Sequence, residues 1–168
     1  WRTADGTRVE LAFTVLGLGK LGSEELNFSS DVDLVYVHES PRALLDLGRA
    51  QDDDVARAAP ADYFTRLAQA FGRLVSPVTM DGFLYRIDLD LRPEGGQGAM
   101  VTSQDAIETY YEAWADTWER AAFMKARPVA GDLALGWRVV RQLDPMIYHS
   151  TMDYGAVESI RSLKQKVE

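Results

Sequence analysis

Two aspartates one residue apart are the part of the chain best suited to chemistry. Asp31 and Asp33 open the segment Asp-Val-Asp-Leu-Val-Tyr-Val-His, which has the apolar character of a central β-strand. Because side chains alternate along a strand, both carboxylates lie on one face, with Cα atoms about 6.5–7 Å apart. Carboxylates at that separation can bind one or two hard cations, of which Mg²⁺ is the expected one. On this pair alone a structural role is the more common explanation, since acids often begin strands.

A glycine-rich turn lies just before that strand. Gly17, Gly19 and Gly22 punctuate it, and Ser23 follows directly. Gly22 and Ser23 would offer a phosphate a close backbone approach, free N–H groups and a hydroxyl. Glycines followed by a spaced pair of aspartates on a strand are the arrangement of nucleotidyltransferases. Lys20 lacks the surrounding pattern of a P-loop, so we interpret it as a solvated turn residue.

A further carboxylate lies on a third expected strand, residues 83–91. Along it Arg86, Asp88, Asp90 and Arg92 alternate with apolar residues, so one face of the strand is polar. Nucleotidyl transfer with two metal ions needs a carboxylate on a neighbouring strand, which favours Asp88 over the alternative of a surface strand with alternating charges. Arg86 and Arg92 flank it and could bind triphosphate oxygens.

Three longer motifs resemble one known family. Residues 19–34, Gly-Lys-Leu-Gly-Ser-Glu-Glu-Leu-Asn-Phe-Ser-Ser-Asp-Val-Asp-Leu, resemble the signature of the bifunctional glutamine synthetase adenylyltransferase/adenylyl-removing enzymes. Residues 84–95 and 117–132 are similar to later segments of the same family, in the expected order. The resemblance runs from about Phe13 to Glu168 and therefore covers nearly the whole chain.

The resemblance implies a nucleotidyltransferase domain that controls glutamine synthetase. Members of the family carry two homologous halves: one transfers AMP from ATP to a tyrosine of the synthetase, and the other removes it by phosphorolysis, giving ADP. Residues 25–30, Glu-Leu-Asn-Phe-Ser-Ser, are more similar to the removing half, which is the activity we expect. The transferring half is one alternative, and a non-catalytic module that binds nucleotide and a partner protein is another. A PII signalling protein is a further implied partner, through a longer chain.

By motif matching, the resemblance also implies the residues that bind two Mg²⁺ ions and the phosphates: Asp31, Asp33, Asp88, Gly22 and Ser23. The implied substrates and products are ATP, ADP, AMP and phosphate. The chain departs from the family at two positions, since Ser23 stands where a second glycine is usual and Asp90 where a basic residue is usual. The extra carboxylate would lower phosphate affinity or pair with a neighbouring arginine.

Composition excludes several other classes of protein. The 18 Lys+Arg and 26 Asp+Glu residues give a net charge of −8, which argues against general binding of nucleic acid or of an anionic membrane. With no cysteine there is no disulfide, thiolate zinc site or cysteine nucleophile, and a cytoplasmic location is the default expectation. No targeting signal follows Trp1, and no run approaches the roughly 20 apolar residues of a membrane span. Because the chain opens at Trp1 and stops within a charged, helical pattern, we expect an excised domain.

The elements that position these residues follow from periodicity. We expect strands at residues 9–17, 31–38 and 83–91, a long surface loop at 39–60, and helices at 61–75, 104–125, 132–143 and from 154 to the end. Thr102 or Ser103 would cap the longest helix, whose stripe of aromatic residues, Trp114 and Trp118 among them, we interpret as core. The fold class is α/β (α+β), a mixed nucleotidyltransferase-type sheet with flanking helices. Residues 1–131 would form the catalytic domain and 132–168 C-terminal helices leading to an absent further domain.

Three basic residues and two histidines remain to be interpreted. Arg120, Lys125 and Arg127 could contact phosphate or a protein substrate, or could simply complement a helix dipole near a C-terminus. His38 and His149 are interpreted as structural, because the proposed chemistry needs no histidine nucleophile.

Overall fold

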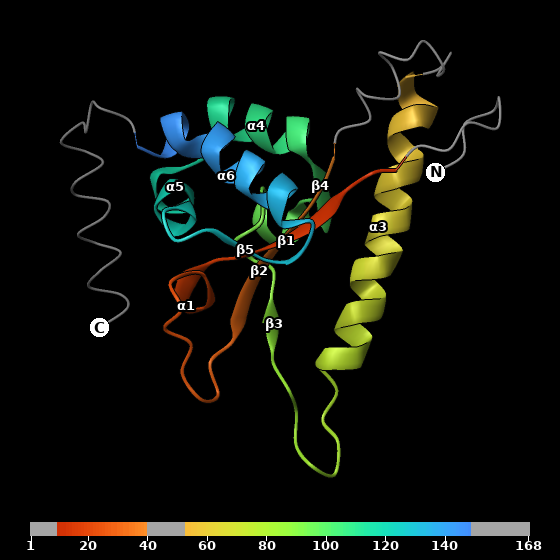
Figure 1. Ribbon diagram of the computed structural model, residues 1–168, viewed down its shortest axis with the longest axis vertical. Helices are drawn as coiled ribbons and strands as arrows, with labels where there is room; N and C mark the ends of the chain where they lie inside the picture. The colour runs from red at the N-terminus through yellow and green to blue at the C-terminus, as the bar shows by residue number, and fades with distance from the viewer. Residues whose placement is uncertain (1–9, 40–52, 149–168) are drawn as a thin grey trace.

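The computed structural model describes residues 10–39 and 53–148, and its centre is a mixed β-sheet (Figure 1). In this part of the chain five strands pair in the order β3-β2-β1-β5, and β4 also pairs with β2. The strands are β1 (Phe13–Gly17), β2 (Val32–His38), β3 (Ile87–Asp88), β4 (Val101–Ser103) and β5 (Arg127–Gly131). β1 is antiparallel to β2 and β5, whereas β3 and β4 run parallel to β2 one after the other along its length. The predicted fold class, a mixed sheet with flanking helices, is confirmed.

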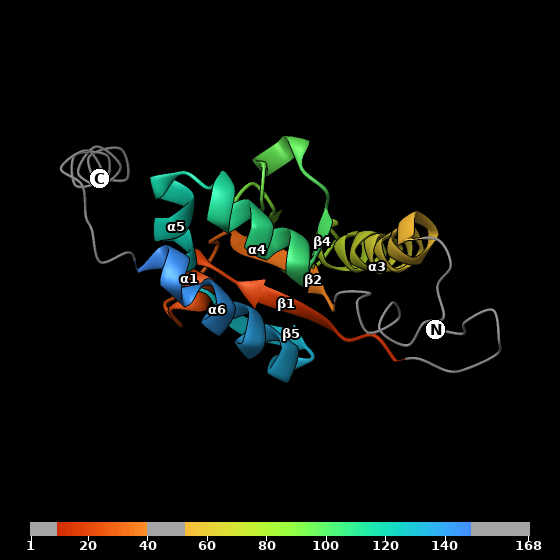
Figure 2. The ribbon, with the colours of Figure 1, turned by 90° about the horizontal axis from the view of Figure 1, so that it is seen from above.

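Helices cover both faces of this sheet (Figures 1 and 2). They are α1 (Gly19–Gly22), α3 (Asp53–Val75), α4 (Gln104–Ala113), α5 (Thr117–Phe123) and α6 (Leu133–Ile147), with a 3₁₀ turn at Gly95–Gln97. Val35 and Val37 of β2 face α4, α5 and α6 in one apolar core, while Leu34 and Tyr36 face α3 in a second. The alternation of β2 side chains therefore gives the sheet a core on each side. None of the described helices is long and apolar enough to cross a lipid bilayer.

Several predicted boundaries are confirmed or moved only slightly. β2 begins at Val32, one residue later than expected, and β1 begins at Phe13. Ser103 is the N-cap of α4, its hydroxyl accepting a hydrogen bond from the N–H of Ala106 at 3.2 Å. α6 extends to Ile147 rather than residue 143. α3 begins at Asp53, so the expected loop is wrong for residues 53–60; residues 40–52 and the helix expected from 154 lie outside the described residues.

The long helix expected at residues 104–125 is wrong, because the chain turns after Ala113. Trp114 and Ala115 both donate backbone hydrogen bonds to the carbonyl of Tyr110, which ends α4. Asp116 then starts α5 with a capping box, in which Glu119 accepts from the backbone N–H of Asp116 at 2.8 Å. Trp114 is consequently 76% exposed rather than in the core, and Trp118 is 39% exposed.

The third strand is also shorter than expected. Only Ile87 and Asp88 pair with β2, because Asp88 Oδ1 accepts the backbone N–H of Asp90 at 2.8 Å and the chain turns there. Arg92 continues this turn: its guanidinium donates to the carbonyls of Leu89 at 2.8 Å and Gly98 at 3.3 Å. The expectation that Arg92 alternates with Asp88 on one polar strand face is therefore wrong. A strand for which no element was expected, β5, joins the sheet beside β1. As an edge strand in the described sheet it tolerates Pro128.

Candidate active site

The end of the sheet where β2 and β3 pair brings two of the predicted acids together. The parallel register places Asp33 directly beside Asp88, on strands that lie about 4.8 Å apart. Asp31 precedes β2 and shares the face of Asp33, since the two are two positions apart. Asp33 and Asp88 thus lie side by side at one sheet end, with Asp31 on the same face, and their role as metal ligands stays a prediction.

Asp33 carries the clearest electrostatic signature of this arrangement. Burial raises the pKa of its carboxyl above the ordinary 3.8, and the negative charges of Asp88 and then Asp31 raise it further. Gly19, which has a φ of 51°, lies against the same side chain, and a Cβ atom at this position would overlap Asp33 Oδ2. Gly19 is therefore needed both for its left-handed backbone and for the room it leaves to the carboxylate.

Asp31 forms an ion pair with Arg86, for which the sequence predicted a contact with triphosphate oxygens. Arg86 Nε lies 2.5 Å from Asp31 Oδ1, so Arg86 pairs with a carboxylate rather than standing free for a phosphate. Both side chains are substantially exposed, at 64% for Arg86 and 45% for Asp31. An ion pair this exposed contributes little to stability, so the guanidinium can exchange partners at low cost.

Gly22 and Ser23 differ from the expected phosphate turn. The N–H of Gly22 donates to the carbonyl of Leu18 and that of Ser23 to Gly19, so neither N–H is free. Ser23 Oγ lies 2.9 Å from both the Gly19 carbonyl and Glu25 Oε2. A Cβ atom at Gly22 would overlap the carbonyl oxygen of Lys125, which explains the glycine by close packing against the backbone.

Arg127 and Lys125 position the glycine turn, a role that the sequence did not reveal. Arg127 donates to the carbonyls of Leu21 and Gly22, at 3.1 Å in each case, and its guanidinium lies 3.5 Å from Glu24. Lys125 Nζ lies 3.5 Å from Glu25 Oε2. These contacts depend on the pairing of β5 with β1, which brings Arg127 back beside α1. Recognising residues 127–131 as a strand would have been the only way to predict them from the sequence.

Arg120 lies away from the carboxylates. Its guanidinium donates to the carbonyls of Tyr111, Ala115 and Met146, at 2.9, 3.1 and 2.6 Å, where α4, α5 and α6 meet. Its side chain therefore stabilises a helix junction and is not directed at a substrate.

His38 is structural, as predicted. It is 2% exposed, its ring stacks on Phe64 with centroids 5.5 Å apart, and its Nδ1 lies 2.7 Å from the carbonyl oxygen of Glu39. Burial lowers the pKa of this imidazole. His149 lies outside the described residues, and Lys20 is exposed on α1 as expected.

The carboxylates of Asp31, Asp33 and Asp88 are suitable ligands for a hard cation, although they do not surround a single point. Within residues 10–39 and 53–148, no three Asp, Glu or His side chains converge closely enough to form a metal site. Asp33 and Asp88 are nevertheless oxygen ligands in register, and their mutual repulsion, visible in the raised pKa of Asp33, is what a bound Mg²⁺ would relieve.

Comparison with known proteins points to one family. The profile of glutamate-ammonia ligase adenylyltransferase matches residues 2–142. The chain is similar to the bifunctional glutamine synthetase adenylyltransferase/adenylyl-removing enzyme of Pseudomonas syringae pv. tomato, with 41% identity over 154 residues, 92% of this chain and 15% of that protein. The enzymes of that name from Pseudomonas putida (42% over 154 residues, 92% and 15%) and Thioalkalivibrio sulfidiphilus (40% over 166 residues, 99% and 16%) are also similar. The chain thus spans 15–16% of the length of these curated relatives.

Proposed function

The chain belongs to the glutamate-ammonia ligase adenylyltransferase family, and from this premise we propose that it removes AMP from an adenylyl-tyrosine of glutamine synthetase by phosphorolysis. In this reaction an oxygen of inorganic phosphate forms a bond to the phosphorus of the AMP group. The bond from that phosphorus to the tyrosine oxygen breaks, and the oxygen takes up a proton. The products are ADP and the unmodified tyrosine.

The observation that carries the proposal is the register of Asp33 and Asp88, with Asp31 on the same face. These three carboxylates would bind two Mg²⁺ ions, which when bound neutralise phosphoryl oxygens and polarise the phosphorus. Gly19 keeps Asp33 in place by leaving room for its carboxylate. When a cation binds Asp31, Arg86 would be released from it to orient a phosphate oxygen, a role that this exposed guanidinium suits.

The direction of the reaction rests on fewer residues. Residues 25–30 resemble the removing half, and Lys125 and Arg127 contact Glu25 and Glu24 beside this stretch. The names of the relatives contain both activities, so transfer of AMP from ATP is the alternative. A non-catalytic module is disfavoured, since it has no need to keep three acids together against their repulsion.

We extend the proposal to partners and organisation. Glutamine synthetase would be the protein substrate and ATP, ADP, AMP and phosphate the small ones, with a PII signalling protein acting through a longer polypeptide in the cytoplasm. Residues 1–131 would be the catalytic domain and 132–168 the link to a further domain, with α6 packed on the sheet at its start.

Two assays test this function. The chain, and any longer polypeptide that contains it, is incubated with adenylylated glutamine synthetase plus phosphate, and separately with unmodified synthetase plus ATP. We expect ADP release in the first assay, falling by about 10²–10³-fold in Asp88→Ala, as when a group that stabilises transition-state charge is lost. Asp81→Ala, an exposed change in the preceding turn, is the matched control. AMP incorporation in the second assay alone would assign the transferring half.

Metal binding is measured independently of turnover. Mg²⁺ should raise the melting temperature of the chain, and the double variant Asp31→Asn, Asp33→Asn should lose that increase, because a ligand stabilises only the state that binds it. Equal stabilisation of the double variant by Mg²⁺ would remove these residues from the metal site, and full activity of Asp88→Ala would remove Asp88 from the reaction.

A further inference from the structure

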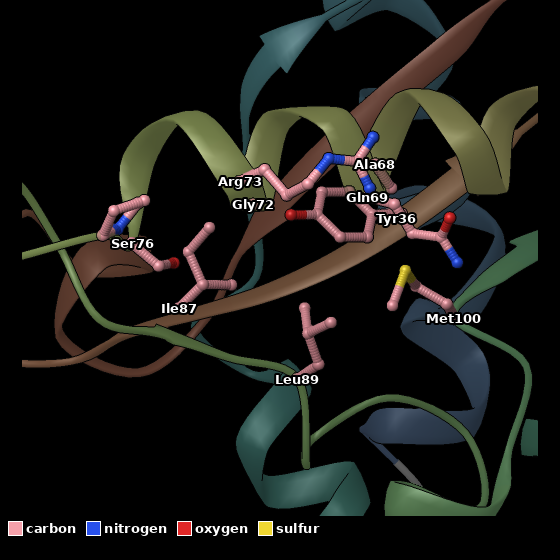
Figure 3. A pocket seen from close by; sticks show the side chains of 10 residues that line it. Tyr36, Ala68, Gln69, Gly72, Arg73, Ser76, Ile87, Leu89 and Met100 are labelled. Atoms are coloured by element: carbon pink, nitrogen blue, oxygen red, sulfur yellow. The ribbon is translucent and has the colours of Figure 1, made fainter.

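A groove lies between α3 and the sheet, on the face opposite the carboxylates (Figure 3). Tyr36 and Ile87 line it, whereas Asp33 and Asp88 alternate with them and face the other side. Its volume is about 560 Å³, within the range of small-molecule sites. The apolar lining comes from Ala68, Ile87, Leu89 and Met100.

Tyr36 places an unused hydrogen-bond donor in this groove. The side chain is only 2% exposed, and Figure 3 shows its hydroxyl turned into the space between α3 and the segment that carries Ile87 and Leu89. Among the described residues none forms a hydrogen bond with this hydroxyl. Burial raises the pKa of Tyr36 to about 12, so the group keeps its proton at neutral pH and remains a donor. The hydroxyl oxygen itself is not sealed from solvent, since among the described residues only the hydroxyl of Tyr111 is both buried and unpaired, so Tyr36 can donate to water or to the acceptor of a bound molecule.

Arg73 adds a positive charge at the rim of the same groove. It lines the opening together with Gln69, both on α3, and Figure 3 shows the two side chains along one edge. No ion pair joins Arg73 to another side chain in the part of the chain that the structure describes. A guanidinium stays charged at every physiological pH and matches the geometry of carboxylates, sulfonates and phosphates.

We propose that this groove binds a small amphipathic anion. Its apolar body would pack on Ile87, Leu89 and Met100, a hydrogen-bond acceptor would meet the hydroxyl of Tyr36, and its anionic group would pair with Arg73. The site is separate from the proposed nucleotidyl-transfer site, because the two lie on opposite faces of the sheet, so either assignment can fail without the other.

Gly72 provides a way to close the groove without unfolding the protein. It lies on the groove wall within α3, and a Cβ atom built there meets no other atom within 4 Å. A leucine at this position fills open space and suits a helix better than glycine does. The variant Gly72→Leu should therefore fold normally, which its melting temperature would verify.

Two fluorescent compounds of similar shape test the proposal: 8-anilinonaphthalene-1-sulfonate, which is anionic, and N-phenyl-1-naphthylamine, which is neutral. We expect the sulfonate to bind with one-to-one stoichiometry and Gly72→Leu to weaken both compounds at least tenfold. Arg73→Gln should weaken the sulfonate about three- to tenfold and leave the neutral compound unchanged, and Tyr36→Phe should weaken the sulfonate severalfold. Leu74→Gln, an exposed apolar position on the same helix outside the groove, is the matched control and should change neither.

Three results would overturn the proposal. Unchanged binding in Gly72→Leu would place the compounds elsewhere on the surface. Equal effects of Arg73→Gln on the two compounds would exclude recognition of the anion. Loss of sulfonate binding as the chain is concentrated, together with dimer formation in sedimentation, would assign the groove to a second copy of this chain.

Discussion

The surroundings of Asp33 lower the stability of the folded chain in a way that suits the binding of a ligand. Its carboxylate is partly buried and repelled by Asp88 and Asp31, while Gly19 gives up a side chain to make room for it. None of these features favours the folded state at neutral pH. Such arrangements are typical of functional sites, where charges are kept together for a ligand that is yet to bind.

The first prediction concerns the pH dependence of this cost. Because the pKa of Asp33 is raised in the folded chain, the native state binds more protons than the unfolded state between the ordinary pKa of 3.8 and the folded value. Stability therefore falls as pH rises through that window, and the loss is complete above it. Asp33→Asn should melt higher than the wild type at pH 7 without Mg²⁺, by no more than about 4 °C, since a kcal/mol moves the midpoint of a domain this size by about 2–4 °C.

The difference should shrink as the pH falls below 3.8, where Asp33 is protonated in both states. Melting curves by circular dichroism from pH 7 to pH 3 measure it, with Asp62→Asn on the exposed side of α3 as the control. A variant less stable than the wild type at pH 7 would mean that the backbone hydrogen bond of Asp33 and the charge of Lys20 outweigh its burial and the repulsion by Asp88 and Asp31.

Whether the role of a single residue could be predicted depended on the kind of partner that it contacts. Asp33 and Asp88 were found from alternation, because strand periodicity fixes the face of each carboxylate. The placement of Arg92 on a strand face was wrong, and the roles of Arg120 and Arg127 stayed open, because all three bind backbone carbonyls, which no residue type in the sequence identifies. The sequence does not distinguish an arginine that is available to a ligand from one whose guanidinium binds backbone carbonyls.

Among the helices and strands, the break between α4 and α5 is the instructive case. The aromatic stripe with helical spacing continues across it, so periodicity predicted one helix. The capping box at Asp116 and Glu119 was present as a local signal, and it prevails because it satisfies the free N–H groups of a new helix. β5 was missed for the opposite reason: Pro128 disfavours a strand locally, and only the edge position beside β1 permits it.

Arg120 stabilises this junction, and the second prediction follows from its geometry. A lysine has a single ammonium group and cannot reach the carbonyls of Tyr111, Ala115 and Met146 at once, so Arg120→Lys should lower the free energy of unfolding by about 2–4 kcal/mol. Urea unfolding measures the change, with Arg141→Lys on the exposed side of α6 as the control. A variant of normal stability that binds phosphate or glutamine synthetase poorly would instead support a substrate contact.

Across the sheet as a whole, the two faces are unequally covered. Leu135, Val139 and Leu143 bury α6 in the core that α4 and α5 share, and all three are at most 1% exposed. On the other face α3 lies beside the sheet with no second helix next to it in the described residues (Figures 1 and 2), and it buries mainly Phe64 and Ala68. Three other apolar side chains of this helix, Leu67, Phe71 and Leu74, are 44%, 41% and 78% exposed. Periodicity predicted the helix and its inner face, but the extent of cover depends on neighbours that periodicity does not specify.

This asymmetry predicts that the structure opens in parts. Stability is lowest where few apolar contacts cross to the rest of the fold, so α3 should detach while the sheet and α4–α6 stay folded. In native-state hydrogen exchange, amides in the middle of α3 should exchange at least about tenfold faster than those of α6, a difference of about 1.4 kcal/mol in opening free energy. Phe64→Ala should speed exchange in both α3 and α6, because both openings lose its contact, whereas Leu135→Ala should speed exchange in α6 by a larger factor than in α3, since that leucine stays packed while α3 is open. Equal protection of α3 and α6, or equal effects of Leu135→Ala on the two helices, would show a single cooperative unit. Under the predicted outcome, β2 keeps Asp33 in place while α3 is open, because the face that carries this carboxylate belongs to the more stable core.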